Sequence, residues 1–260
     1  MIRLQGLSYC VDSCLERGLT NALASACAGM RRSTINHRIP IGLLLLSRQQ
    51  LTHEELRSAL ETQRVAGYGR IGEWLQSLGY VREEQITAAL ARQWSCPILR
   101  GEMPGGRSHR AALIPLALMR WLALAPVDFV ESTRTLHIAF SEGLDYHLLY
   151  AIELMLDCHT ESCLVRPSVL RRHLERIGER HAESEVQFEQ VMEVVEFARI
   201  IRSYAVRVAA VEIRVAGCGP HIWVRLIRPA LEPMDLIVRQ LHNASYSAGP
   251  APPVSAAIAI

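Results

Sequence analysis

The sequence predicts an α+β protein with three parts: a helical tandem-repeat subdomain, a small α/β sandwich and a degenerate third α/β unit. Two observations lead to this fold class. A helical pattern occurs twice between residues 40 and 93, with corresponding positions 30 residues apart. Helical and strand patterns then alternate, which is typical of helices covering a sheet. Half of the 260 residues are apolar, so the chain can bury several cores.

The charge composition excludes several classes of function. The formal net charge is only +2, which gives no reason to expect nucleic acid as a partner. All 28 basic residues are arginine. Without lysine the chain can form neither a Schiff base nor a standard P-loop, whose lysine reaches the nucleotide phosphates. No catalytic residues are therefore assigned.

Seven cysteines at irregular spacings indicate reduced thiols in a cytoplasmic protein rather than a disulfide framework. A metal site could be imagined at Cys158, Cys163 and His173. The spacing of these residues and the lack of a second cysteine pair disfavour it, so no metal ligand is predicted.

The amino-terminal residues 1–36 lack a sustained apolar period and are predicted to be poorly ordered or marginally helical. Met30 is an alternative start of the protein, in which case residues 1–29 would be an over-extension. Further along, residues 111–127 are apolar, but Pro115, Arg120 and Pro126 interrupt them. The sequence therefore predicts no transmembrane segment.

Residues 37–100 form the predicted repeat subdomain, and each copy reads as helix, turn and helix. In the second copy Gly79 stands where a helix commonly ends in the left-handed conformation. Gln49 holds the same place in the first copy, so that turn must differ or be strained. Thr52 and Glu55 have the spacing of a capping box that opens the next helix.

Residues 107–180 form the predicted sandwich, residues 185–242 the degenerate unit, and residues 243–260 a disordered tail. The sandwich elements expected are a helix at 111–119, a hairpin of strands 122–130 and 135–140, a helix at 145–156, a strand at 162–166 and a helix at 167–177. After an acidic linker at 183–189 we expect a helix at 191–206, strands at 209–215 and 221–227, and a helix at 234–241.

The second copy of the repeat resembles a known motif, the repeat of the amino-terminal, MshEN-type domain of type II secretion and type IV pilus assembly ATPases. The copy reads Arg70-Ile71-Gly72-x-x-Leu75-x-x-x-Gly79-x₆-Ile86-x-x-x-Leu90-x-x-Gln93. The first copy departs from this motif at Pro40, where the family has arginine, and at Gln49, where it has glycine. The resemblance extends over residues 37–178.

This resemblance implies two functions, and both stay open. One is docking to an inner-membrane platform component of a secretion or pilus apparatus. The other is binding of cyclic di-GMP by the repeat at residues 70–93, since some family members bind this ligand. The ligand surface so implied comprises Arg70, Ile71, Gly72, Leu75, Gly79, Ile86, Leu90 and Gln93, with Ile41, Gly42, Leu45, Leu56, Leu60 and Gln63 from the first copy.

Arginine suits such a site because its planar guanidinium can both stack on a guanine and bond to its edge. Arg70 is therefore the main candidate, Gln63 and Gln93 are expected to be polar anchors, and Arg38 could partly replace the arginine missing at Pro40. Gly72 and Gly79 would let the backbone approach a ligand closely. The same residues at helical spacing also describe an ordinary helical core.

Residues 185–242 resemble an eroded start of the ATPase core, without a Walker A loop. The ATP hydrolysis of the family therefore does not carry over, and we expect a non-enzymatic protein that requires no cofactor. We expect it in the cytoplasm, held at the inner membrane through its partner.

Overall fold

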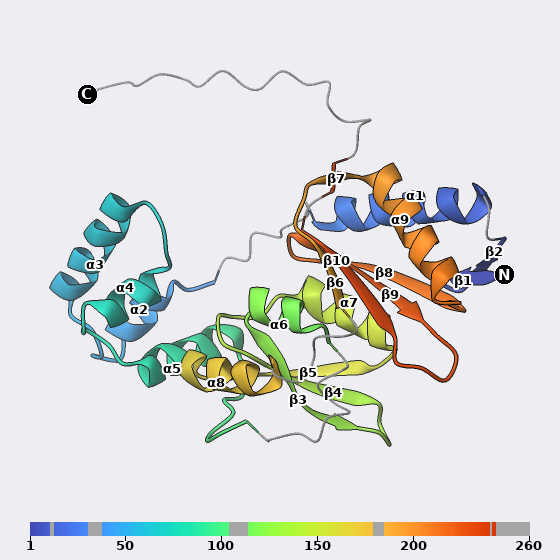
Figure 1. Cartoon of the computed structure of the whole chain (residues 1–260). Helices are drawn as coiled ribbons and strands as arrows, with labels where there is room; N and C mark the ends of the chain where they lie inside the picture. The colour runs from blue at the N-terminus through green and yellow to red at the C-terminus, as the bar shows by residue number, and fades with distance from the viewer. Residues whose placement is uncertain (11–12, 31–37, 104–113, 179–184, 240, 243–260) are drawn as a thin grey trace, which may run out of the picture.

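The computed structural model describes residues 1–10, 13–30, 38–103, 114–178, 185–239 and 241–242. It confirms the α+β class: the described residues form nine helices, a six-stranded mixed sheet and a three-stranded sheet (Figure 1). The predicted tail at residues 243–260 lies outside the described residues. Among the described helices, none is long and apolar enough to cross a membrane.

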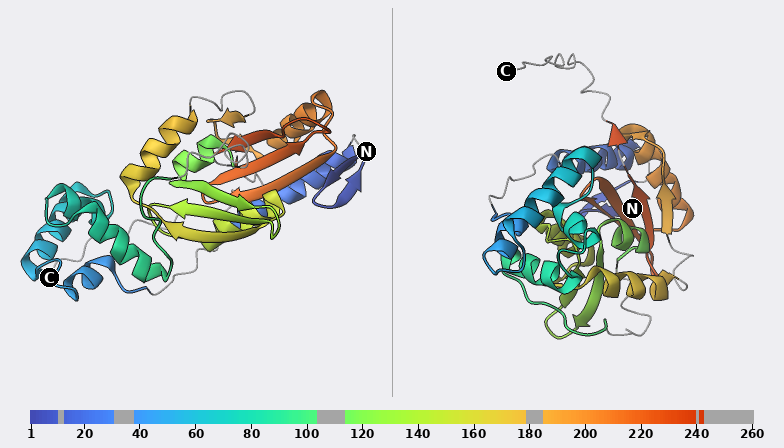
Figure 2. Two further views of the ribbon diagram at one scale, coloured as in Figure 1. Left: turned by 90° about the horizontal axis from the view of Figure 1, so that it is seen from below. Right: turned by 90° about the vertical axis from the view of Figure 1, so that its left-hand side faces the viewer.

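The repeat subdomain lies at one end of the molecule (Figure 2). Its helices are α2 Ile41–Leu46, α3 His53–Ala66, α4 Ile71–Ser77 and α5 Glu83–Trp94. The repeats exchange partners, because α2 packs against α5 and α3 against α4. The small core contains matched pairs 30 residues apart, namely Leu45 with Leu75, Leu51 with Val81 and Ala59 with Ala89. The sequence period is therefore a pseudo-two-fold symmetry in space.

The two turns inside the repeats have the same conformation. Gln49 has a φ of 56° and Gly79 a φ of 75°, both in the left-handed region. The next amide donates in each case to the corresponding leucine, Gln50 N–H to the Leu45 carbonyl and Tyr80 N–H to that of Leu75, both at 3.0 Å. Of the two expectations for Gln49, the strained turn is the one observed. The capping box at Thr52 is also present.

The α/β sandwich follows the predicted order of elements. These are α6 Leu116–Trp121, β3 Leu124–Val130, β4 Thr135–Phe140, α7 Tyr146–Leu156, β5 His159–Leu164 and α8 Pro167–Gly178. The hairpin of β3 and β4 is confirmed, and β5 joins β4 in parallel. Strand β5 begins and ends earlier than predicted, because it pairs with the whole length of β4.

The third unit contains more strands than the sequence suggested. Its elements are β6 Glu185–Phe188, β7 Met192–Glu193, α9 Val194–Arg207, β8 Glu212–Cys218, β9 His221–Ile227, β10 Met234–Val238 and β11 Leu241–His242. The helix predicted at residues 234–241 is wrong. Leu236, Ile237 and Val238 are buried in strand β10, which pairs with β9 on one side and β6 on the other. The linker predicted at residues 183–189 is likewise largely strand β6.

Of the two alternatives for residues 1–36, a poorly ordered segment is wrong for the described part, which contains a long helix and two strands that were not predicted. The chain begins with β1 Ile2–Leu4, β2 Leu7–Tyr9 and α1 Ser13–Met30. Strand β1 pairs in parallel with β8, so the sheet has the order β2-β1-β8-β9-β10-β6. Helix α1 buries Leu15, Leu19 and Leu23 completely against this unit. Residues 1–30 thus supply structure to the third unit.

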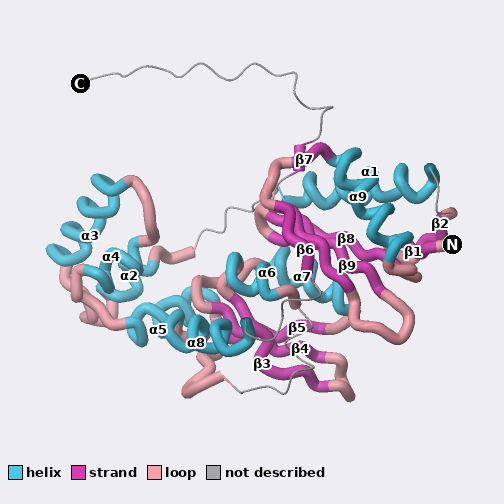
Figure 3. Tube along the Cα trace, in the orientation of Figure 1, coloured by secondary structure: helices cyan, strands magenta, loops and turns pink. Residues whose placement is uncertain are grey.

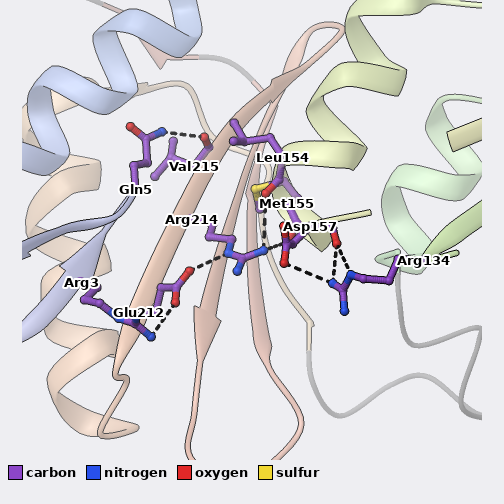
Figure 4. A network of polar contacts seen from close by, with 9 residues as sticks. All are labelled: Arg3, Gln5, Arg134, Leu154, Met155, Asp157, Glu212, Arg214 and Val215. Atoms are coloured by element: carbon purple, nitrogen blue, oxygen red, sulfur yellow. Dashed lines mark hydrogen bonds and ion pairs between the residues drawn. The ribbon is translucent and has the colours of Figure 1, made fainter. Parts of the chain in front are cut away.

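Helices cover both faces of the six-stranded sheet. Helices α1 and α9 lie on one face, and α7 lies on the other, between this sheet and the three-stranded sheet (Figures 1 and 3). Val224 faces the first layer and Trp223 the second. At the end of α7, the Arg214 guanidinium donates to the Met155 carbonyl at 3.0 Å and to Glu212 at 2.7 Å (Figure 4). The third unit is therefore joined firmly to the sandwich.

Candidate functional site

The two motif glutamines join the repeats to each other. Gln63 Nε2 donates to the Gly69 carbonyl at 2.8 Å, and Gln93 Nε2 donates to the Ile39 carbonyl at 2.7 Å. Each bond links the second helix of one repeat to the residue that precedes the first motif position of the other. The two glutamines expected to bind a ligand thus bind backbone carbonyls of this chain.

The motif glycines at the starts of α2 and α4 differ in how closely the neighbouring helix approaches them. A Cβ at Gly42 would lie 2.8 Å from Leu56 Cδ1, and one at Gly72 would lie 3.4 Å from Ile86 Cγ2. Gly79 has open space around its missing Cβ, and its positive φ accounts for the residue. Close packing therefore explains Gly42 and backbone conformation explains Gly79, whereas a Cβ at Gly72 would make only an ordinary contact.

Most apolar motif residues form the core between the repeats. Leu45 and Leu75 are fully buried, and four others pack around them: Ile41, Leu56, Ile71 and Ile86. Leu90 packs against the core of the sandwich, whereas its counterpart Leu60 is 47% exposed. The apolar residues of the implied ligand surface thus belong mainly to the protein core.

Arg70 remains reachable from solvent. It precedes α4, and its guanidinium binds the carbonyl of Glu142 at 3.1 Å and the carboxylate of Glu142 at 2.9 Å. Its backbone N–H donates to the Glu73 carboxylate at 3.1 Å. The Arg70 side chain is 62% exposed. A ligand could therefore reach this guanidinium, but it would compete with Glu142.

Arg38 has a different role from the one expected. Its guanidinium carbon lies 3.3 Å above the centre of the Trp94 ring and 5.9 Å from that of Tyr146. Its Nη1 donates to the Gln93 carbonyl at 3.1 Å. Arg38 thus joins the repeat subdomain to the start of α7 and does not replace the arginine missing at Pro40.

Contacts between α5 and the sandwich were not predicted. Glu83 accepts hydrogen bonds from the Ser168 backbone at 2.7 Å and from its hydroxyl at 2.6 Å. Glu84 binds Arg166 at 2.7 Å. The pKa of Glu84 is lowered, mainly by the hydrogen bond from its own backbone N–H and to a smaller extent by the hydrogen bond from Arg166. The acidic start of α5 is visible in the sequence, but its partners lie more than 80 residues away.

Of the two cysteines considered for a metal site, Cys158 is buried and Cys163 is partly buried. Burial raises the pKa of Cys158 and of Cys163 to about 11, so both are protonated at neutral pH. The described residues contain no group of three or more histidine, cysteine or acidic side chains arranged to hold a metal ion.

No protein-family model matches this chain, and no curated protein is similar to it. The chain is structurally similar to a solved structure of MshE with cdg, at 27% identity and a TM-score of 0.45, over 54% of this chain and 99% of that one. It is also similar to the N-terminal domain of XpsE, at 21% identity and a TM-score of 0.41, over 52% of this chain and 92% of that one.

Proposed function

We propose that this chain is a non-enzymatic docking module, which binds an inner-membrane platform component of a type II secretion or type IV pilus apparatus from the cytoplasm. The proposal rests on one observation, that the motif residues contact other parts of the repeat subdomain itself. Gln63 and Gln93 hold the backbone of the opposite repeat, and Gly42 lets α2 pack closely against Leu56 of α3. The motif therefore builds a rigid scaffold, and binding is left to its surface.

An apolar patch on the first repeat fits a protein partner. Ile39 is 60% exposed and Leu43 is 52% exposed, and Leu43 is four residues further along at the start of α2. Their counterparts in the second repeat are Gly69 and Glu73, so this patch occurs only once. Exposed apolar surface of this kind is typical of protein contacts.

The test is capture of the platform component from the native host by the tagged full chain. We expect the wild type to recover it and Leu43→Asp to lose it. The matched control is Val206→Asp on α9, which places the same charge at another exposed apolar side chain of a helix and should keep the interaction. Recovery of no secretion or pilus component at any salt concentration would contradict the proposal.

The absence of enzymatic activity belongs to the same proposal. The sequence has no lysine and no Walker A loop, so it lacks the groups that hold nucleotide phosphates in P-loop ATPases. We expect purified protein to turn over no ATP. Steady turnover that is abolished by a mutation in this chain would contradict the expectation.

Binding of cyclic di-GMP is a second candidate, favoured by Arg70. This guanidinium is exposed beside the start of α4 and can both stack on a base and bond to it. Binding would exchange its two contacts with Glu142 for contacts with the ligand. Glu142→Gln should therefore strengthen binding, because it removes the competing negative charge. Titration calorimetry of wild type and this variant tests the competition, and equal affinities would contradict it.

A further inference from the structure

The outer face of α3 carries charges of alternating sign. Glu54, Arg57, Glu61 and Arg64 are spaced by three, four and three residues, so they lie on one face of the helix. All four are exposed. Arg57 and Glu61 approach each other at 3.5 Å, whereas Glu54 and Arg64 form no ion pair with another described residue. We refer to these four residues as the α3 charge face.

The corresponding face of the second repeat is an interface. Residues 84, 87, 91 and 94 of α5 are the counterparts of the α3 charge face. There Thr87 and Ala91 are buried, Glu84 binds Arg166, and Trp94 packs against the core of the sandwich. The pseudo-symmetry thus presents the same surface twice. One copy is covered by the sandwich, and the other is open.

The charge pattern of the open copy is complementary to itself. In an antiparallel arrangement of two α3 helices about a two-fold axis, Glu54 lies opposite Arg64 and Arg57 lies opposite Glu61. Both pairs are centred on the same position, residue 59, so one arrangement satisfies all four charges of each copy. A two-fold interface requires this reciprocity, in which a residue and its partner exchange roles between the copies.

We propose that two copies of this chain associate through the α3 charge face, antiparallel and about a two-fold axis. Leu60 lies next to the centre of the pattern and is 47% exposed, so it supplies apolar contact near the axis. The second copy occupies on the first repeat the place that the sandwich occupies on the second. This interface is separate from the patch at Leu43, so it does not depend on the docking proposal.

The association is weak and sensitive to salt. Helix α3 has 14 residues and is therefore about 21 Å long, which limits the buried area to that of transient contacts. Exposed ion pairs contribute little individually and are screened at high ionic strength. The dimer therefore forms at high protein concentration and low salt, and it dissociates on dilution.

The experiment is sedimentation equilibrium of the full chain with two charge-reversal variants. Glu54→Arg places an arginine opposite Arg64 of the second copy, and Arg64→Glu places a glutamate opposite Glu54. We expect each variant alone to dimerise at least about tenfold more weakly than the wild type, because two attractive contacts become repulsive. An equimolar mixture should associate again, since the arginines of one variant meet the glutamates of the other.

Glu196→Arg on α9 is the matched control, because Glu196 is also an exposed glutamate in the first turn of a helix. It should dimerise like the wild type. The recovery in the mixture distinguishes a lost interface from a misfolded variant. A monomeric wild type at the highest soluble concentration in low salt would overturn the proposal, even if α3 captured a different protein. A mixture that fails to associate would overturn it too.

Discussion

The turn at Gln49 can be stabilised by making it match its counterpart. Gln49 has a φ of 56°, and the corresponding Gly79 has a φ of 75°. A side chain in the left-handed region costs roughly 1–2 kcal/mol, and glycine removes this cost but adds freedom to the unfolded chain worth about 0.4–1 kcal/mol. Gln49→Gly should therefore stabilise the repeat subdomain by about 0.5–1 kcal/mol.

The reverse change has the opposite sign. Gly79→Ala should destabilise the subdomain by about 0.5–1 kcal/mol by the same balance, and the whole cost is conformational because a Cβ there would meet no atom within 4 Å. Gln50→Gly is the control. Gln50 is not in the left-handed region, so glycine adds freedom to the unfolded chain without relieving strain.

The assay is native-state hydrogen exchange of the full chain, read on the amides of α3 and α5. It reports the free energy of opening of the repeat subdomain without requiring the whole protein to unfold at once. We expect slower exchange in Gln49→Gly and faster exchange in Gly79→Ala and Gln50→Gly. Faster exchange in Gln49→Gly would refute the argument, because it would mean that the glutamine is not strained.

Three further expectations concern the third unit and the ligand. Leu19→Ala should destabilise the third unit by about 2–5 kcal/mol, measured by chemical denaturation, because Leu19 is fully buried; an effect near zero would show that α1 is not part of this core. Burial lowers the pKa of His221, and the positive charge of Arg239 lowers it further. The His221 imidazole therefore binds a proton less readily in the native protein than in the unfolded chain. Stability should fall as the pH drops below the ordinary value of 6.5, and His221→Gln should reduce that slope in denaturation at several pH values. If cyclic di-GMP binds, calorimetry should give micromolar affinity, because the contact missing at Pro40 costs roughly 1.5–3 kcal/mol, or about ten- to a hundredfold. Arg70→Ala should abolish this binding and Pro40→Arg should strengthen it, whereas tight binding indifferent to Arg70→Ala would contradict the site.

The repeat and the hairpin could be predicted because their signals are local. The 30-residue period is written in the sequence, and the strands of the hairpin alternate in polarity. Strands β1 and β10 could not be predicted in the same way. Strand β1 has three residues, and its partner β8 lies more than 200 residues further along the chain. Strand β10 is buried on both faces, so its consecutive apolar residues Leu236, Ile237 and Val238 lack the alternation that indicates a strand.

The roles of the motif residues could be predicted only in part. The sequence marks Gly42 and Gly72 as motif residues, but a ligand and a neighbouring side chain would select glycine alike. The structure shows that Leu56 leaves no room for a Cβ at position 42, whereas Ile86 would be in ordinary contact with one at position 72. In the same way the motif marks Gln63 and Gln93 as polar anchors but does not identify what they bind. Their acceptors lie in the opposite repeat, and these carbonyls come close only because the two repeats pack their helices against each other.

The most direct test of the docking role is a competition between this chain and a complete secretion or pilus ATPase of the same host. The measurement is the amount of ATPase bound to the purified cytoplasmic part of the platform component as this chain is added. The account predicts that the chain displaces the ATPase, and that Leu43→Asp displaces it far less. Simultaneous binding of both proteins, or no binding of this chain, would contradict the account.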